Sequence, residues 1–157
     1  MAILVGRLEA DGTVRMMTPK IWASVTDSWY VTKTTPVDVA DMLNTVRLLY
    51  VHGVYVYEFA TLAIQQALVT LEAAFAHRLN RPDDTFGALI QQARKQGLID
   101  SGEYDDLYRA ARRLRNGFGH SRAQTLMSPG MVVPMIRRVY KTIAHLWPDD
   151  SEATHGD

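Results

Sequence analysis

Apolar residues recur along most of this chain at the three- and four-residue spacing of a helix with one buried face. The longest such stretch places Ile64, Leu68, Leu71, Phe75 and Leu79 in one row. The following residues 80–83 contain Asn, Pro and Asp, which are typical of a helix end. The pattern predicts a long core helix in the middle of the chain.

Two more helices flank this one. Asp38 is a suitable N-cap for an earlier helix that kinks or ends at Gly53 and has Met42, Val46 and Leu49 on its apolar row. A later helix is capped by Asp84 or Thr85 and stops at Gly97. Its predicted inward residues are Phe86, Leu89, Ile90 and Ala93.

The last two helices lie in the C-terminal third. One runs from about residue 102 to 115 with Ser101 as its cap, and its apolar row is Leu107, Ala110, Ala111 and Leu114. Gly117 is predicted to end this helix as a left-handed cap, because glycine costs about 1 kcal/mol in a helix interior. After a loop at residues 124–130, the final helix buries Val132, Ile136, Val139, Ile143 and Leu146.

The N-terminal segment has a different pattern. Residues 2–9 and 13–18 flank an Asp-Gly step, which favours a hairpin turn, and residues 22–35 show no regular period. We therefore predict an all-α protein, an up-and-down bundle of four to five helices with a small N-terminal β-hairpin-like appendage. The predicted divisions are an appendage at residues 1–36, a helical domain at 37–148 and a disordered acidic tail at 149–157.

Composition is consistent with one domain that has a real core, because 47% of the 157 residues are apolar. There is no cysteine, so disulfides and thiolate chemistry are excluded, and a cytoplasmic location is expected. Residues 54–76 are strongly apolar, but Glu58 and Glu72 interrupt them and favour a core helix over a membrane span. No metal motif is present, and no cofactor is predicted.

The formal net charge of zero conceals a strong asymmetry, because residues 107–148 contain no acidic residue. A cluster of this kind attracts and positions phosphates without reading sequence, although a solvated helix face has the same composition. The predicted phosphate-binding residues are Arg109, Arg112, Arg113, Arg122, Arg137, Arg138 and Lys141.

Candidate chemistry lies inside this basic segment. Four arginines are followed by a histidine after four to six intervening residues, but only Arg115 has a polar residue, Asn116, directly after it. Its histidine is His120. On a helix, Arg115 falls at the rim of the buried face beside Tyr104 and Tyr108, an unusual place for a solvated charge.

Arg115, Asn116 and His120 resemble the Arg-polar-x3–5-His motif of ribonucleases in the HEPN superfamily of helical domains. The order of residues 85–90, 97–99, an acidic helix start and then Leu114-Arg115-Asn116 is also similar to such domains, over roughly residues 38–148. The resemblance implies a metal-independent endoribonuclease of toxin or antiviral-defence type, with Arg115, Asn116 and His120 as its catalytic residues.

In that chemistry a histidine moves the proton of the ribose 2′-hydroxyl or of the leaving oxygen, and an arginine holds the phosphate. The products are a 2′,3′-cyclic phosphate and a 5′-hydroxyl, and DNA should resist. The resemblance further implies a homodimer that joins two motifs in one cleft, and a cognate antitoxin or nucleotidyltransferase partner. Arg122 stands where some toxin members have the tyrosine that a nucleotidyltransferase modifies, which argues against that mode of silencing.

A structural interpretation remains open for each of these residues. His120 could cap the broken helix, Arg115 could pair with Glu58 or Glu72, and Asn116 could be a plain C-cap. Tyr104 and Tyr108 suit packing at the core rim better than base stacking. The alternative function is a non-catalytic helical module for dimerisation, nucleotide binding or protein interaction.

Overall fold

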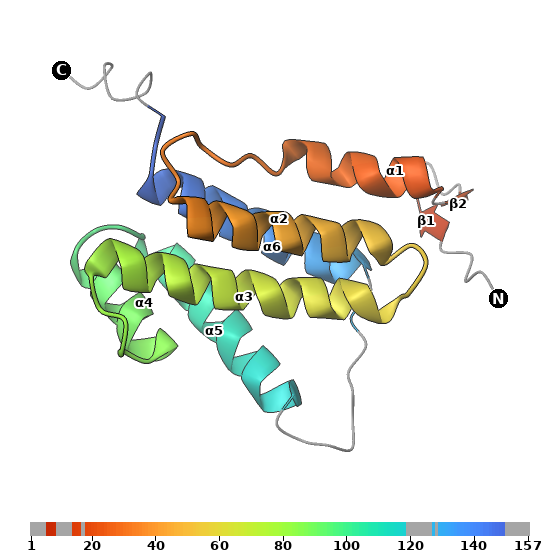
Figure 1. Ribbon diagram of the computed structural model, residues 1–157. Helices are drawn as coiled ribbons and strands as arrows, with labels where there is room; N and C mark the ends of the chain where they lie inside the picture. The colour runs from red at the N-terminus through yellow and green to blue at the C-terminus, as the bar shows by residue number, and fades with distance from the viewer. Residues whose placement is uncertain (1–5, 9–13, 17, 119–126, 128, 150–157) are drawn as a thin grey trace.

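The computed structural model describes residues 6–8, 14–16, 18–118, 127 and 129–149 (Figure 1). Its helices are α1 (Pro19–Ser24), α2 (Val37–His52), α3 (Glu58–Leu79), α4 (Phe86–Lys95), α5 (Ser101–Phe118) and α6 (Pro129–Leu146), with a 3-10 turn, η1 (Val25–Ser28), after α1. Two three-residue strands, β1 (Gly6–Leu8) and β2 (Val14–Met16), pair antiparallel with Arg7 opposite Arg15. The predicted all-α class is confirmed.

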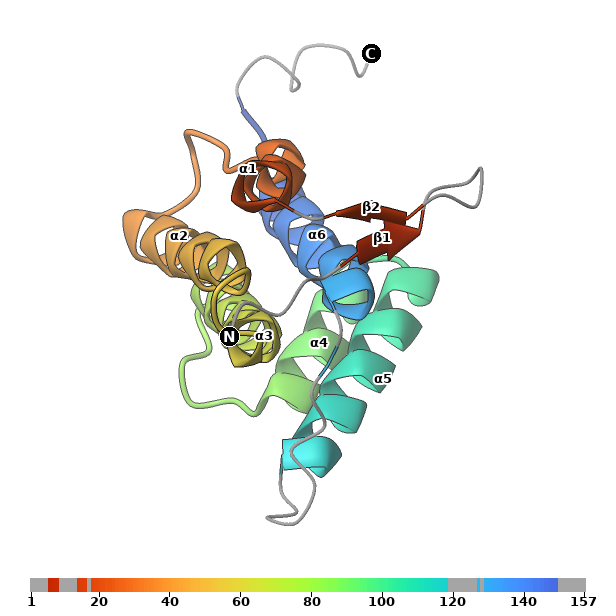
Figure 2. The same ribbon diagram turned by 90° about the vertical axis from the view of Figure 1, so that its right-hand side faces the viewer.

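α3 is the central helix and lies against α2, α4 and α6 (Figures 1 and 2). Its buried large side chains are interleaved with the fully buried alanines Ala60, Ala63, Ala67 and Ala74. Small residues at a helix contact shorten the distance between the two helix axes. α3 can therefore pack closely against neighbours on more than one side.

Local signals at both ends of the α3–α4 connection are confirmed. Asn80 ends α3 in the left-handed conformation at φ 52°, and the Arg81 N–H donates to the Ala76 carbonyl at 2.9 Å. Thr85 caps α4 by accepting from the Ala88 N–H at 3.4 Å. Gly97, at φ 71°, follows the end of α4 in the same conformation as Asn80.

The segment predicted to be irregular at residues 22–35 begins with a helix and a 3-10 turn instead. Trp22 and Trp29 are fully buried, and both contact Tyr50 at the end of α2, with ring centroids 5.3 and 5.0 Å apart. Trp29 also packs on Tyr140 of α6 at 5.3 Å. The prediction failed because burial of two indoles, rather than helical periodicity, holds this segment.

The buried row of α2 is shifted from the predicted one. Val39, Leu43, Val46 and Tyr50 are buried, whereas Met42 and Leu49 are only half-buried. The helix begins at Val37 after Pro36, so Asp38 lies in its first turn and is not the N-cap. α2 has adjacent apolar rows, and the row that meets α3 and the tryptophans is the one buried.

α6 follows its prediction closely. Val132, Ile136, Val139, Ile143 and Leu146 are all buried, and Tyr140 and Thr142 are buried with them. The helix begins at Pro129, so the predicted loop at residues 124–130 is too long at its C-terminal end. Proline suits a first helical position, because its missing N–H would have no partner there.

Candidate functional site

The predicted catalytic motif begins on α5. Arg115 and Asn116 have helical backbone, whereas their side chains and the whole of His120 lie outside the described residues. The helix does not end at Arg115, and Gly117 is not its left-handed cap, because helical backbone continues through Gly117 to Phe118. One glycine near the end of a formed helix is tolerated because the preceding turns already hold the backbone.

The C-terminal end of α5 projects beyond the other helices (Figures 1 and 2). In both views it extends away from the bundle, whereas the N-terminal part of the same helix lies beside α4 and near α6. The motif-bearing end of the helix is thus the part least surrounded by the rest of the fold.

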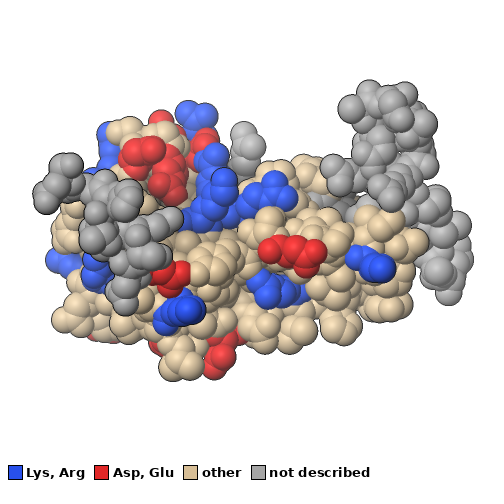
Figure 3. Space-filling view, turned by 90° about the horizontal axis from the view of Figure 1, so that it is seen from above, with Lys and Arg blue, Asp and Glu red and all other residues tan. Residues whose placement is uncertain are grey.

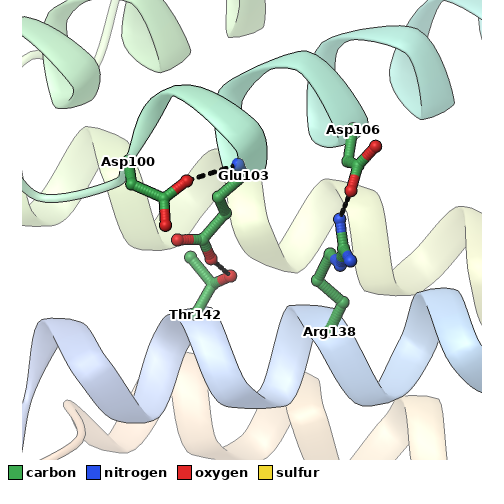
Figure 4. Close-up of polar contacts among 5 residues, drawn as sticks. All are labelled: Asp100, Glu103, Asp106, Arg138 and Thr142. Carbon is green, nitrogen blue, oxygen red and sulfur yellow. Dashed lines mark hydrogen bonds and ion pairs between the residues drawn. The ribbon is translucent and has the colours of Figure 1, made fainter.

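Polar contacts fix the N-terminal part of α5 (Figure 4). The Glu103 N–H donates to the Asp100 carboxylate at 2.7 Å, so Asp100 rather than Ser101 is the cap. A carboxylate there also has a favourable interaction with the helix dipole. Across the interface, Thr142 of α6 donates to Glu103, and Arg138 of α6 pairs with Asp106.

These two contacts join the first two turns of α5, which carry its acidic residues, to the basic helix α6. Arg109, Arg137 and Lys141 are exposed, so they remain available to a phosphate. Arg138 is engaged by Asp106 and is the weakest member of the predicted set. The side chains of Arg112 and Arg113, and all of Arg122, fall outside the described part of the chain.

Charge on the upper face of the molecule is mixed (Figure 3). Lysine and arginine side chains meet there, but aspartates and glutamates lie directly beside them. This face therefore carries no uniform basic patch.

The tyrosines of α5 form a stack. The rings of Tyr104 and Tyr108 are nearly parallel, at an interplanar angle of 11° and a centroid distance of 5.7 Å. Arg94 of α4 places its guanidinium carbon 4.8 Å from the centroid of the Tyr104 ring. Tyr104 is half-buried and Tyr108 is 41% exposed, so the stack runs from the core rim outward.

A cavity of about 610 Å³ lies elsewhere, between the N-terminal segment and α6. The residues that line it include Ser28, Thr32, Tyr140, Lys141 and His145. Sequence reasoning missed this cavity because its walls come from two segments more than a hundred residues apart. No spacing along the chain could have signalled it.

Two groups at this cavity have shifted pKa values. Burial raises the pKa of Tyr140 to about 12, and the nearby Arg47 guanidinium opposes part of that shift. The pKa of Asp149 is lowered because its carboxylate accepts hydrogen bonds from the Tyr30 hydroxyl and the Lys33 N–H. Asp149 thus links the end of the helical part to the segment before α2.

Within the described residues, the other histidines and the tryptophans are placed as expected of packing or surface residues. His52 is exposed and its Nδ1 lies 2.8 Å from the Leu48 carbonyl. His77 packs edge-on against Trp147, with ring centroids 5.8 Å apart. Within the described ranges, no group of three or more potential metal-ligating side chains comes together.

α3 is long and apolar enough to cross a membrane by length and composition alone, with a mean hydropathy of 1.4. Half of its most apolar 18-residue window is buried inside the protein, and core helices of soluble proteins pass the same test.

Comparison with protein-family models, curated proteins and solved structures finds no match to this chain.

Proposed function

We propose that this protein is a metal-independent endoribonuclease that uses Arg115 and His120 on the phosphodiester of RNA. The observation that carries the proposal is the composition of α5. Exposed Arg109 follows the stacked tyrosines on that helix, and the helix ends only two residues before His120. Cationic and aromatic side chains together suit a ligand that has phosphates and bases.

The chemistry needs only side chains of this chain. His120 would accept the proton of the ribose 2′-hydroxyl as that oxygen attacks phosphorus, or donate one to the leaving 5′-oxygen. Arg115 would hold two phosphate oxygens as negative charge develops on them. Asn116 would orient the imidazole or contact the phosphate. The products are a 2′,3′-cyclic phosphate and a 5′-hydroxyl.

A homodimer belongs to the same proposal, since acid and base steps generally need two groups and this motif offers one histidine. The projecting end of α5 supports this arrangement because a second copy can approach it without displacing another helix. The proposal also includes an up-and-down course of the bundle, a β-hairpin at the N-terminus, a cytoplasmic location and a cognate antitoxin.

The test is cleavage of labelled total RNA in excess EDTA. The His120→Ala variant should cleave about 10²- to 10⁴-fold more slowly than wild type, as expected for the loss of a general acid or base. Arg115→Lys keeps the charge but loses two-point contact, so it should also be impaired. Product ends should be cyclic phosphate and 5′-hydroxyl.

His52→Ala is the matched control. Arg47 and His52 have the same spacing as Arg115 and His120, but Leu48 follows the arginine and His52 is an exposed helix-end residue. This variant should cleave at the wild-type rate. A well-folded dimer that cuts no RNA would contradict the nuclease proposal.

That negative result would favour the second candidate, a non-catalytic module that binds a nucleotide. The cavity beside α6 is the specific observation behind it, since its volume of about 610 Å³ is in the range of small-molecule sites. Lys141 and Ser28 line the cavity, and an ammonium and a hydroxyl are suitable partners for a phosphate and a ribose.

A further inference from the structure

We propose that Tyr108 is a stacking platform for one unpaired base of single-stranded RNA, next to the motif. This inference rests on the proposed ribonuclease function and names the form of RNA that the site takes. It starts from the Arg94–Tyr104–Tyr108 stack, which neither the motif nor the basic residues require.

The Arg94 guanidinium carbon lies 4.8 Å from the centroid of the half-buried Tyr104 ring, and the nearly parallel Tyr108 ring lies 5.7 Å from that centroid. The stack therefore has its outer member at Tyr108, the more exposed of the two rings. An arginine over a tyrosine face and two nearly parallel rings make a rigid platform, because each plane restrains the next. A nucleobase offers another flat π face to such a platform.

The direction of the stack follows the helix. Residues four apart on an α-helix are separated by a rise of about 6 Å, close to the 5.7 Å between the two ring centroids. A base on Tyr108 would continue the series toward the C-terminal end of α5. The rise from Tyr108 to Arg115 is about 10 Å, which roughly three stacked nucleotides span at about 3.4 Å each.

The distribution of charges along α5 also favours an RNA backbone that lies toward the C-terminal end of this helix. The acids of this helix, including Glu103 and Asp106, are confined to its first two turns, and these two contact α6. Arg109 follows Tyr108 directly, and no acid occurs from there to residue 148. The charges of α5 itself thus favour phosphates beyond Tyr108. A base on Tyr108 and a phosphate near Arg115 are compatible with one strand.

A double-mutant cycle between ring and base tests this. Fluorescence anisotropy would compare a labelled 12-nucleotide oligoadenylate with an abasic oligomer of the same length and charge. Both would be measured in the full-length His120→Ala background so that cleavage does not consume the probe. In this background the further substitution Tyr108→Ala should weaken oligoadenylate binding roughly five- to 150-fold. It should leave abasic binding nearly unchanged.

Three variants serve as controls in the same background. Tyr108→Phe should restore binding because it keeps the ring. Tyr108→Leu, which keeps apolar bulk without a π face, should stay weak and guards against misfolding of the alanine variant. Tyr55→Ala removes an exposed tyrosine between α2 and α3 and should bind like the background protein.

Equal losses for oligoadenylate and abasic oligomer would show that Tyr108 acts on the fold or on phosphates, and would overturn the platform. Unchanged RNA binding in Tyr108→Ala would overturn the platform and leave the ribonuclease proposal standing. Failure of the background protein to bind either oligomer, together with no cleavage by wild type, would overturn both.

Discussion

Tyr140 joins three parts of the molecule through a single side chain. Its hydroxyl donates to the Leu43 carbonyl of α2, its ring packs on Trp29, and it forms part of the cavity wall on α6. Burial disfavours the charged phenolate, whereas Arg47 favours it, and burial is the larger effect. The side chain is therefore neutral in the folded protein well into the alkaline range.

This environment predicts a loss of stability at high pH. In the unfolded chain Tyr140 ionises near 10.0, and in the folded protein its pKa is about 12. The stabilisation that neutral Tyr140 contributes to the folded state is thus fully present below pH 10. It is lost as pH rises from 10 to 12. The loss should be on the order of 2 kcal/mol.

Urea unfolding of wild type and Tyr140→Phe between pH 7 and 11.5 measures this contribution. At pH 7 the variant should lose about 1 kcal/mol, the value of one hydrogen bond. The difference between the two proteins should shrink or reverse above pH 10. A constant difference over the whole range would contradict a raised pKa.

At the scale of the elements, Gly53 at the end of α2 has the least room for a side chain among the described glycines. A Cβ on Gly53 would lie 2.9 Å from the Tyr50 carbonyl oxygen and 3.3 Å from the Trp22 ring. Trp22 also donates its indole N–H to that same carbonyl. α1 is thereby held against the C-terminal end of α2.

Gly53→Ala should consequently destabilise the protein by about 1–3 kcal/mol, the usual cost of overpacking. Gly87→Ala in α4 is the matched control, because a Cβ added at Gly87 would have no neighbouring atom within 4 Å. That substitution should be neutral or stabilise by up to about 1 kcal/mol. Thermal melts that shift equally for both variants would show that the contact at Gly53 relaxes freely.

The elements that are predictable from sequence are those with local signals. Thr85 marks the start of α4 because its hydroxyl caps a helix, and Gly97 marks the end because glycine readily adopts a positive φ. α6 is predictable because it has a single apolar row. α1 escapes prediction because burial of Trp22 depends on Tyr50 and Gly53, which lie far along the chain. The motif helix is longer than its pattern predicts because the low helical propensity of Gly117 matters less in a last turn than in a helix interior.

The candidate site was predictable only in its sequence-local part. Arg115, Asn116 and the tyrosines share one helix, so their spacing signals them. The contact of Arg94 with Tyr104 depends on the packing of α4 on α5, and the cavity depends on α6 meeting the N-terminal segment. Neither arrangement leaves a pattern in the order of residues.

Across the whole molecule, the residues before α2 contribute to the core. Trp22 and Trp29 are fully buried against α2 and α6, although the sequence pattern places them in an appendage. Each buried aromatic side chain removes roughly 150–250 Å² from water, worth about 4–6 kcal/mol at 25 cal/mol per Å². Two of them approach the total stability of an ordinary domain.

A chain that begins at residue 37 should therefore fail to fold cooperatively. Near-UV circular dichroism and a thermal melt would report the loss of fixed tertiary packing. A chain that begins at residue 18 keeps both tryptophans and provides the comparison. If the shorter chain melts with the same cooperativity and midpoint, residues 1–36 are a separate appendage after all.

The buried cluster of Trp22, Trp29 and Tyr50 also determines what intrinsic fluorescence can report. Trp22 and Trp29 share one buried cluster, and Trp147 packs beside His77. None of the three tryptophans lies on α5. The emission of Trp22 and Trp29 will be blue-shifted because both are buried, and it will follow the docking of α1 onto α2. Ligands that bind at the stacked tyrosines should leave that emission unchanged, whereas detachment of the N-terminal segment should shift it to the red. The protein thus carries a built-in optical probe of its first helix.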